Sequence, residues 1–276
     1  MTDTPAPVTG TPPAADESGG RTDRPWRFEW VIDTAAVGAA VLGHMVRPST
    51  WRRPARREFV RFMGVAGADC VSSVALAAIL TGFGLLFQVL WWLEQLGQST
   101  QLSAIILRIL VREIAPFTVG VLAIGHSGLI ILSELSRMRA DGRMRALDAQ
   151  GVDPFVLFVV PRVAALSVSV FCLTMLFVAI APVVALLAAM TFHVSHQPPG
   201  TILLGFLGTI GAQGYAVLPL NSLSMGFAIG TVCCVTAMTG PDLRSRRGDG
   251  ALLAVGFFRA LLLIFLISGV VSLVVQ

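Results

Sequence analysis

The run VAALSVSVFCLTMLFVAIAPVVALLAAM, residues 163–190, decides the fold, because it contains no charged residue along its whole length. A helix rises about 1.5 Å per residue, so this run can cross a hydrocarbon core of roughly 30 Å. The whole chain has a matching composition, with 55% apolar residues, 13% charged residues and a mean hydropathy of +0.77. An ordinary soluble domain carries about 25% charged residues. We therefore expect an all-α integral membrane protein.

Further apolar runs on both sides of residues 163–190 predict about five transmembrane helices in total. These runs cover residues 65–93, 102–132, 217–238 and 251–275. A weaker run, residues 29–46, is interrupted by Asp33 and His44 and predicts a helix that lies at the membrane interface. Residues 201–214 have glycine at positions 205, 208, 211 and 214 and predict a short interfacial or closely packed helix before the fourth span.

The sequence predicts an organisation in three parts. Residues 1–28 contain proline and acidic residues instead of an apolar signal core, which predicts a disordered cytoplasmic leader. Residues 29–64 are expected to form interfacial or elbow helices. Their arginines can hold lipid phosphates while neighbouring aromatic rings lie at headgroup depth. Residues 65–276 would form the transmembrane domain.

The arginines predict the orientation of the chain in the membrane. Six precede the first span from Arg47 onward, four lie in residues 133–153 and three in 241–250, whereas residues 94–101 and 192–200 contain none. Arginine-rich segments remain on the cytoplasmic side of a membrane. We therefore expect the N-terminus in the cytoplasm and the C-terminus outside.

The composition excludes several kinds of chemistry. All 20 basic residues are arginine, so the chain lacks the lysine of a nucleotide-binding P-loop and cannot hydrolyse ATP by itself. The net charge of +4 comes from arginines between apolar runs, which indicates membrane orientation and not nucleic-acid binding. Neither the four cysteines nor His193 and His196 have companions that complete a metal site. His126 and Ser127 are adjacent, without an acidic third member nearby, and we predict no catalytic residues.

Charged residues inside the second apolar run are the first candidates for a functional site. Arg108 and Arg112 are four residues apart and share one helix face, and Glu113 follows directly. Charges at this depth must face a cavity or the interior of the bundle. They are either a polar mouth that attracts an anionic headgroup or an internal pair that fixes helix packing. Arg259 in the last run also needs a partner, which Asp69 or Glu113 could supply.

The polar segment 133–153 is the second candidate. It is too charged to enter lipid and predicts one helix over 133–152, which Gly151 and Pro154 end. Glu134 could reach Arg137 or Met138 on the same helix face. Such a helix could dock in a groove of a partner ATPase. The alternative is a solvated basic loop that only sets the topology.

Five short motifs link both candidates to a known family. They are LVREIAP at 110–116, GHSG at 125–128, SELSRMR at 133–139, GVDP at 151–154 and VPR at 160–162. In order and spacing they resemble the MlaE/YrbE family, the permeases of bacterial lipid transporters associated with MCE proteins. The similarity in topology extends over roughly residues 30–275.

The resemblance implies an inner-membrane permease that works as a pair of copies, as a homodimer or a heterodimer. It further implies a cytoplasmic ABC ATPase dimer that binds ATP and magnesium, an MCE-domain protein on the outer side, and no cofactor in this chain. The implied lipid pocket lies between the two permeases and includes Gly82, Leu85, Gln88, Arg108, Arg112 and Glu113. The implied ATPase-coupling residues are Glu134, Arg137, Met138, Arg139, Arg143 and Gly151.

The leading hypothesis is a permease subunit that moves phospholipid or a related lipid through that pocket, driven by a partner ATPase. A membrane scaffold that anchors an MCE protein is the first alternative, and it predicts a core without a lipid-sized cavity. A membrane-embedded lipid-modifying enzyme is the second alternative. It would need a clustered acid, base or nucleophile near the membrane surface, and the sequence offers no such set.

Overall fold

The computed structural model describes residues 29–47, 53–96, 110–191, 199–240 and 246–274, and these residues are almost entirely helical. Within them, five helices are long and apolar enough to cross a membrane. They cover Arg53–Gly84, Arg112–Ala140, Phe155–Thr191, Val217–Thr239 and Gly250–Val271. The expected all-α membrane fold with five spans is therefore confirmed.

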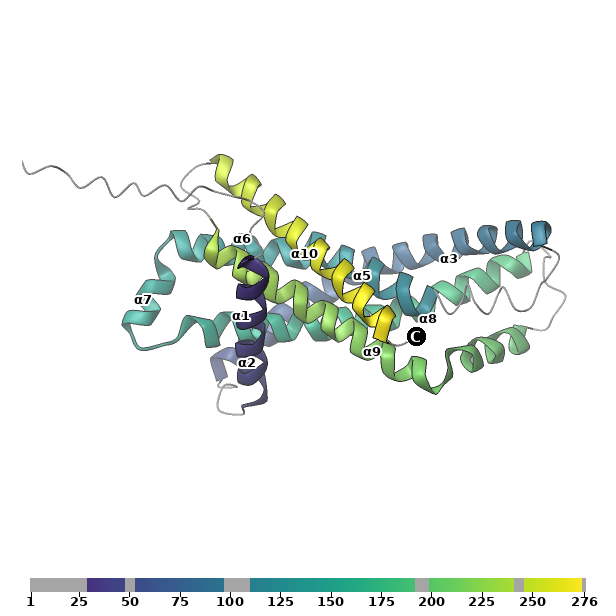
Figure 1. Ribbon diagram of the computed structural model, residues 1–276, viewed down its shortest axis with the longest axis horizontal. Coiled ribbons are helices and arrows are strands. Elements are labelled where there is room, and N and C mark those ends of the chain that lie inside the picture. The colour runs from purple at the N-terminus through teal and green to yellow at the C-terminus, as the bar shows by residue number, and fades with distance from the viewer. Residues whose placement is uncertain (1–28, 48–52, 97–109, 192–198, 241–245, 275–276) are drawn as a thin grey trace, which may run out of the picture.

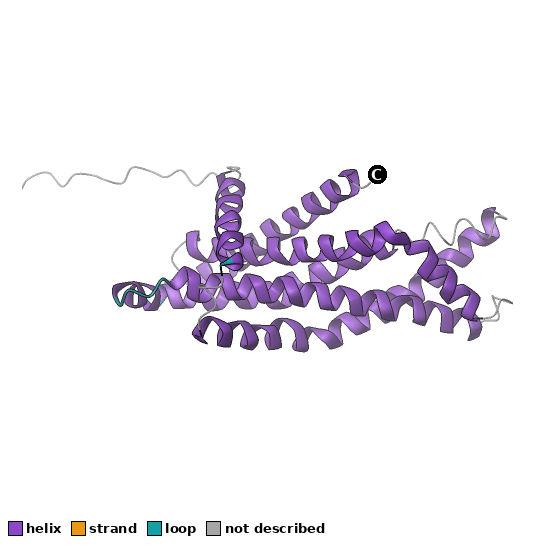
Figure 2. Cartoon of the chain, turned by 90° about the horizontal axis from the view of Figure 1, so that it is seen from below, coloured by secondary structure: helices purple, strands orange, loops and turns teal. Residues whose placement is uncertain are grey.

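Helix α1 (Glu29–Val46) precedes the first span, and α2 (Arg53–Met63) forms the beginning of it. Helix α1 runs across the bundle, whereas the long helices follow its length (Figures 1 and 2). Helix α2 continues through the π-helical segment η2 (Gly64–Ala68) into α3 (Asp69–Leu96) without a break. The elbow and the first span therefore form one continuous helical path.

The second span consists of short helical segments. The π-helical segments η3 (Leu110–Ile114) and η4 (Ile124–Gly128) flank α5 (Ala115–Ala123), and α6 (Leu129–Ala140) follows. Helix α7 (Arg143–Ala149) projects at one end of the bundle, which we call the α7 end (Figure 1). Because π-helical turns change the register of a helix, they redirect the side chains that follow.

The remaining spans are long single helices. The third span begins in η5 (Phe155–Val159) and continues as α8 (Val160–Thr191), which packs against α2, α3, α5 and α9 at the centre of the bundle. Helices α9 (Pro199–Thr239) and α10 (Arg246–Val274) follow. A Cβ at Gly226 would lie 2.7 Å from Ser167 Cα, and one at Gly230 would lie 3.1 Å from Val163 Cα. Glycine at these positions lets α8 and α9 approach backbone to backbone.

Two sequence-based expectations about helix boundaries were wrong. The single helix predicted over 133–152 is two helices, because Gly142 has a φ of 71° and ends α6, after which α7 begins. The separate helix predicted at 201–214 is part of α9, since the helix runs on from Pro199 through Pro219 to Thr239. The glycines at 205–214 therefore do not interrupt the helical backbone.

Candidate functional site

The structure brings polar residues of three spans together around the start of the second span. Arg112 Nε lies 3.9 Å from Glu113 Oε1, and Ser268 of α10 donates a hydrogen bond of 3.0 Å to Glu113 Oε2. Asn221 of α9 donates from its amide to the carbonyl oxygen of Arg112 at 3.5 Å. We call these four residues the Arg112 site. Arg112 and Glu113 were predicted from the sequence, whereas sequence analysis missed Asn221 and Ser268.

The Arg112 site contains polar atoms without a hydrogen-bond partner among the described residues. Nε and Nη2 of Arg112 and Oδ1 of Asn221 are buried and have no hydrogen bond within the described part of the chain. The side chains of Arg112 and Glu113 are nevertheless 28% and 31% exposed, so the site is open at one side. An unsatisfied buried donor costs about 1–3 kcal/mol. An anionic oxygen placed beside Arg112 would satisfy its donors.

Asn221 and Ser268 carried a signal in the sequence. Each is a polar side chain inside an apolar run, and such residues face the interior of a bundle. That rule identifies candidates but does not pair them, because the pairing depends on how α9 and α10 pack against η3.

The other predicted pocket residues have different surroundings. Gly82 is buried where α3 crosses α8, and a Cβ there would overlap the carbonyl oxygen of Ala181. Gln88 is exposed, and Leu85 lies on α3 with a side chain that is not described. Arg108 lies outside the described residues. The structure thus gives Gly82 a role in packing, and a lining role for these four residues stays a prediction.

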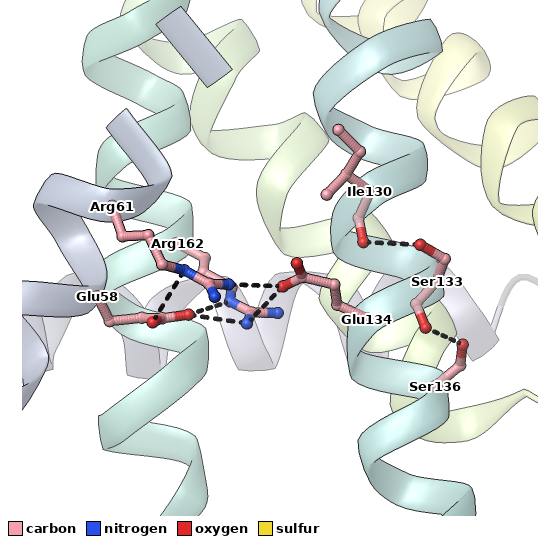
Figure 3. Close-up of polar contacts among 7 residues, drawn as sticks. All are labelled: Glu58, Arg61, Ile130, Ser133, Glu134, Ser136 and Arg162. Carbon is pink, nitrogen blue, oxygen red and sulfur yellow. Dashed lines mark hydrogen bonds and ion pairs between the residues drawn. The ribbon is translucent and has the colours of Figure 1, made fainter. Parts of the chain in front are cut away.

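At the α7 end, four charged side chains form a closed ring of alternating sign between α2, α6 and α8 (Figure 3). Arg162 Nη2 lies 2.8 Å from Glu58 Oε1 and 2.8 Å from Glu134 Oε2. Arg61 closes the ring, with Nη2 2.9 Å from Glu134 Oε2 and Nε 3.5 Å from Glu58 Oε2. We call these residues the ion ring.

The members of the ion ring differ in burial. The Arg162 side chain is 1% exposed and Glu58 15%, whereas Glu134 is 39% and Arg61 55% exposed. Arg162 also donates from Nε to Glu58 Oε1 at 3.0 Å. Its guanidinium carbon lies 5.8 Å from the ring centroid of Phe62 and 5.6 Å from that of Phe158. Arg162 is therefore held by carboxylates and by aromatic faces.

Arg162 is the main residue that sequence analysis overlooked as a site residue. A buried arginine must be paired, so its place at the start of an apolar span was a usable signal. The expected partners of Glu134 were also wrong, because its carboxylate binds Arg61 and Arg162 and not its neighbours on α6. Ser133 and Ser136 bond carbonyl groups of their own helix (Figure 3).

The other predicted coupling residues surround the ion ring. A groove of about 320 Å³ there is lined by Glu58, Arg61, Glu134, Arg137, Met138, Asp141, Arg143, Phe158 and Arg162. Arg139 donates to the carbonyl oxygen of Gly240 at 2.7 Å, at the end of α9. Gly151 has a φ of 75° and lies in the turn after α7. Arg137 and Arg143 are exposed, so the α7 end presents positive charge.

Arg259 has a different neighbour from the carboxylates that the sequence offered, and the role of His126 stays open. Arg259 was expected to pair with Asp69 or Glu113, but its guanidinium carbon lies 5.6 Å from the ring centroid of Trp30 on α1. His126 Nδ1 is buried without a hydrogen-bond partner among the described residues. In the same part of the chain no group of three or more His, Cys, Asp or Glu could hold a metal ion. His193 and His196 lie outside the described residues.

Comparison with known proteins identifies the family. The model of the family "Permease MlaE" matches residues 59–274. The chain belongs to the MlaE permease family. This match includes four of the five spans completely, the Arg112 site and all of the ion ring except Glu58. The chain is thus a multi-pass membrane protein of an ABC-transporter permease family.

Curated relatives agree with this assignment. The "Intermembrane phospholipid transport system permease protein MlaE" of Haemophilus influenzae is 28% identical over 121 residues, which are 44% of this chain and 46% of that protein. A "Probable ABC transporter permease protein" of Synechocystis sp. is 32% identical over 122 residues, 43% of this chain and 45% of that protein. A protein of the same description from Rickettsia felis is 25% identical over 117 residues, 42% and 45% of the two chains. The aligned part therefore spans under half the length of these relatives.

Proposed function

We propose that this permease moves phospholipid, or a related lipid, across or out of a bacterial inner membrane as a subunit of an ABC transporter. The observation that carries the proposal is the Arg112 site, where buried guanidinium donors at the start of a membrane span have no hydrogen-bond acceptor among the described residues. A lipid phosphate has the charge and the acceptor oxygens that these donors need. The name of the Haemophilus influenzae relative includes phospholipid transport, which supports this choice.

The proposed assembly places the Arg112 site in a pocket between two permease copies. A cytoplasmic ABC ATPase dimer, which binds ATP and magnesium, docks at the α7 end, and an MCE-domain protein lies at the opposite end. The N-terminus is then cytoplasmic and the C-terminus lies outside. The exposed Arg137 and Arg143 and the arginine count of the loops support this orientation.

Purification of the tagged chain from its native membrane is expected to recover an ATP-hydrolysing subunit together with bound phospholipid. Changing Arg137 and Arg143 to alanine should lower the recovered ATPase, because both side chains are exposed at the α7 end and outside the ion ring. Protein quantification and mass spectrometry of the retained lipids check this result. Arg47→Ala with Arg56→Ala removes the same charge elsewhere and should leave recovery unchanged. Equal recovery from both double variants would contradict docking at the α7 end.

Arg112→Ala separates a lipid-binding site from a structural ion pair. Because Arg112 and Glu113 are partly exposed, the loss of the pair should destabilise the protein by less than about 1 kcal/mol. Phospholipid affinity should fall by about one to two decades, as expected for one lost charge-assisted hydrogen bond. Thermal unfolding, retained lipid and transport rate would be measured against Arg56→Ala. A stable variant with normal lipid and normal transport would refute the assignment.

A further inference from the structure

Helix α2 presents a row of arginines along one face. Arg53, Arg57 and Arg61 follow one another at intervals of four residues and therefore line one side of the helix. With Pro54 and Glu58 they line a groove of about 390 Å³, which we call the arginine groove. The opposite face packs inward, since Ala55 is 3% and Phe62 1% exposed. The helix is thus anchored by its apolar face and leaves the arginines accessible.

The charges of the arginine groove are not balanced within the described part of the chain. Glu58 is already bound to Arg162 through two nitrogens, at 2.8 and 3.0 Å. Arg61 contacts Glu58 and Glu134 in the ion ring. Arg53 and Arg57 have no ion pair with any described residue. Arg53 and Arg57 therefore face the groove as positive charges that no described carboxylate pairs, and an anion would be attracted to them.

One helical connection and two side-chain contacts place the groove at the level where the spans begin. Helix α2 leads directly through η2 into the first span. Its Phe62 shares the Arg162 guanidinium with Phe158 of η5, where the third span begins. His44 of the transverse helix α1 contacts Phe155 of the same segment, with ring centroids 6.2 Å apart. The ends of membrane spans lie at headgroup depth in a bilayer, so this placement favours a lipid headgroup as the neighbour of the groove.

Helix α1 supports the same level. It crosses the bundle beside this region and exposes large apolar side chains, with Ile32 69%, Leu42 56% and Val46 80% exposed (Figures 1 and 2). A transverse helix with exposed apolar residues is suited to the interface of a bilayer. The occupant that the arginine groove meets at this depth is a lipid headgroup.

We propose that the arginine groove binds the phosphate of an anionic phospholipid in the leaflet at the α7 end, at a site separate from the Arg112 site. The unneutralised Arg53 and Arg57 supply the attraction, and the row spacing lets neighbouring guanidinium groups share one phosphate. Arg61 belongs to both the groove and the ion ring, so a bound phosphate competes with Glu134 for it. Occupancy of the groove is thereby connected to the position of α6.

The test uses the purified full-length permease in phosphatidylcholine nanodiscs and measures the binding of a fluorescent phosphatidylglycerol. Arg53→Gln with Arg57→Gln should weaken binding about 30-fold. Each of the two arginines is expected to contribute a factor of about five to the affinity, and the two factors multiply. The matched control, Arg47→Gln with Arg56→Gln, removes the same charge from exposed positions outside the groove and should change binding less than threefold. Melting temperatures establish that all variants are folded.

Further arms distinguish the sources of phosphate and the two sites. Inorganic phosphate and labelled phosphatidylcholine should compete only weakly with phosphatidylglycerol for the groove. If either competes as strongly as phosphatidylglycerol itself, the proposal is overturned. An equal loss of phosphatidylglycerol binding in both double variants would also overturn it, because the loss would then come from the lower positive charge of the surface in general. Arg112→Ala should keep groove binding, whereas loss of phosphatidylglycerol binding in that variant alone would assign the lipid to the Arg112 site. The outcome does not depend on whether a partner ATPase is recovered, so the proposed function and this proposal can fail separately.

Discussion

Arg162→Ala is expected to destabilise the permease by about 3–5 kcal/mol, because it removes the central cation of the ion ring and leaves the largely buried Glu58 without its main partner. The remaining contact of Glu58, with Arg61 at 3.5 Å, is longer and more exposed. Thermal unfolding of the purified protein measures the loss. Arg162→Lys should recover only part of it, since an ammonium group cannot reproduce the Nε and Nη2 contacts together.

Two controls sharpen this experiment. Arg137→Ala removes an exposed arginine from the wall of the groove around the ion ring and should change stability by less than about 0.5 kcal/mol. Glu58→Leu combined with Arg162→Met removes both buried charges, and it should be more stable than Arg162→Ala alone. If Arg162→Ala melts at the temperature of the unchanged protein, the ion ring does not contribute to stability in the way we describe.

Gly82→Ala should destabilise the protein by about 1–3 kcal/mol, and Gly82→Val by more. The added Cβ meets the backbone carbonyl oxygen of the fully buried Ala181, so α3 and α8 have to separate. Gly84→Ala is the matched control two residues further along α3. A Cβ there has no neighbour within 4 Å, and alanine should stabilise the helix by about 0.5–1 kcal/mol.

The two glycine variants also decide between packing and a lipid contact. If Gly82 acts mainly as a pocket residue, as the family resemblance implies, Gly82→Ala should melt normally and lose bound lipid. Thermal unfolding and lipid mass spectrometry on the same preparation separate the cases. Similar melting temperatures for Gly82→Ala and Gly84→Ala would show that the contact with α8 does not restrict this position.

Much of the fold follows from the sequence because hydropathy reports directly on membrane insertion. The charge-free run at 163–190 and the other apolar runs correspond to the five spans, and Arg112 and Glu113 are neighbours in sequence and in space. The break at Gly142 was missed, because glycine is compatible with a helix and only its positive φ reveals the turn. The continuity of α9 was missed because glycine spacing was given more weight than packing.

The ion ring could not be derived from the sequence for a different reason. Glu58 and Arg61 lie about one hundred residues before Arg162, and their alternation with Glu134 exists only after α2, α6 and α8 have packed. Sequence reasoning could require a partner for a buried arginine without identifying it. In the same way, among the described residues it is the Trp30 ring, and no carboxylate, that faces Arg259. An aromatic ring can be the partner of a buried cation, and a search for carboxylates alone does not find it.

The unequal burial of the ion ring divides it into a permanent half and a reversible half. Arg162 retains Glu58 through two nitrogens in the protein interior, whereas Glu134 and Arg61 meet near solvent, where an ion pair contributes only about 0–1 kcal/mol. Glu134 can therefore leave and return while Arg162 keeps a carboxylate. The contact between Glu134 of α6 and Arg162 is thus the part of the ion ring whose loss leaves the buried cation paired.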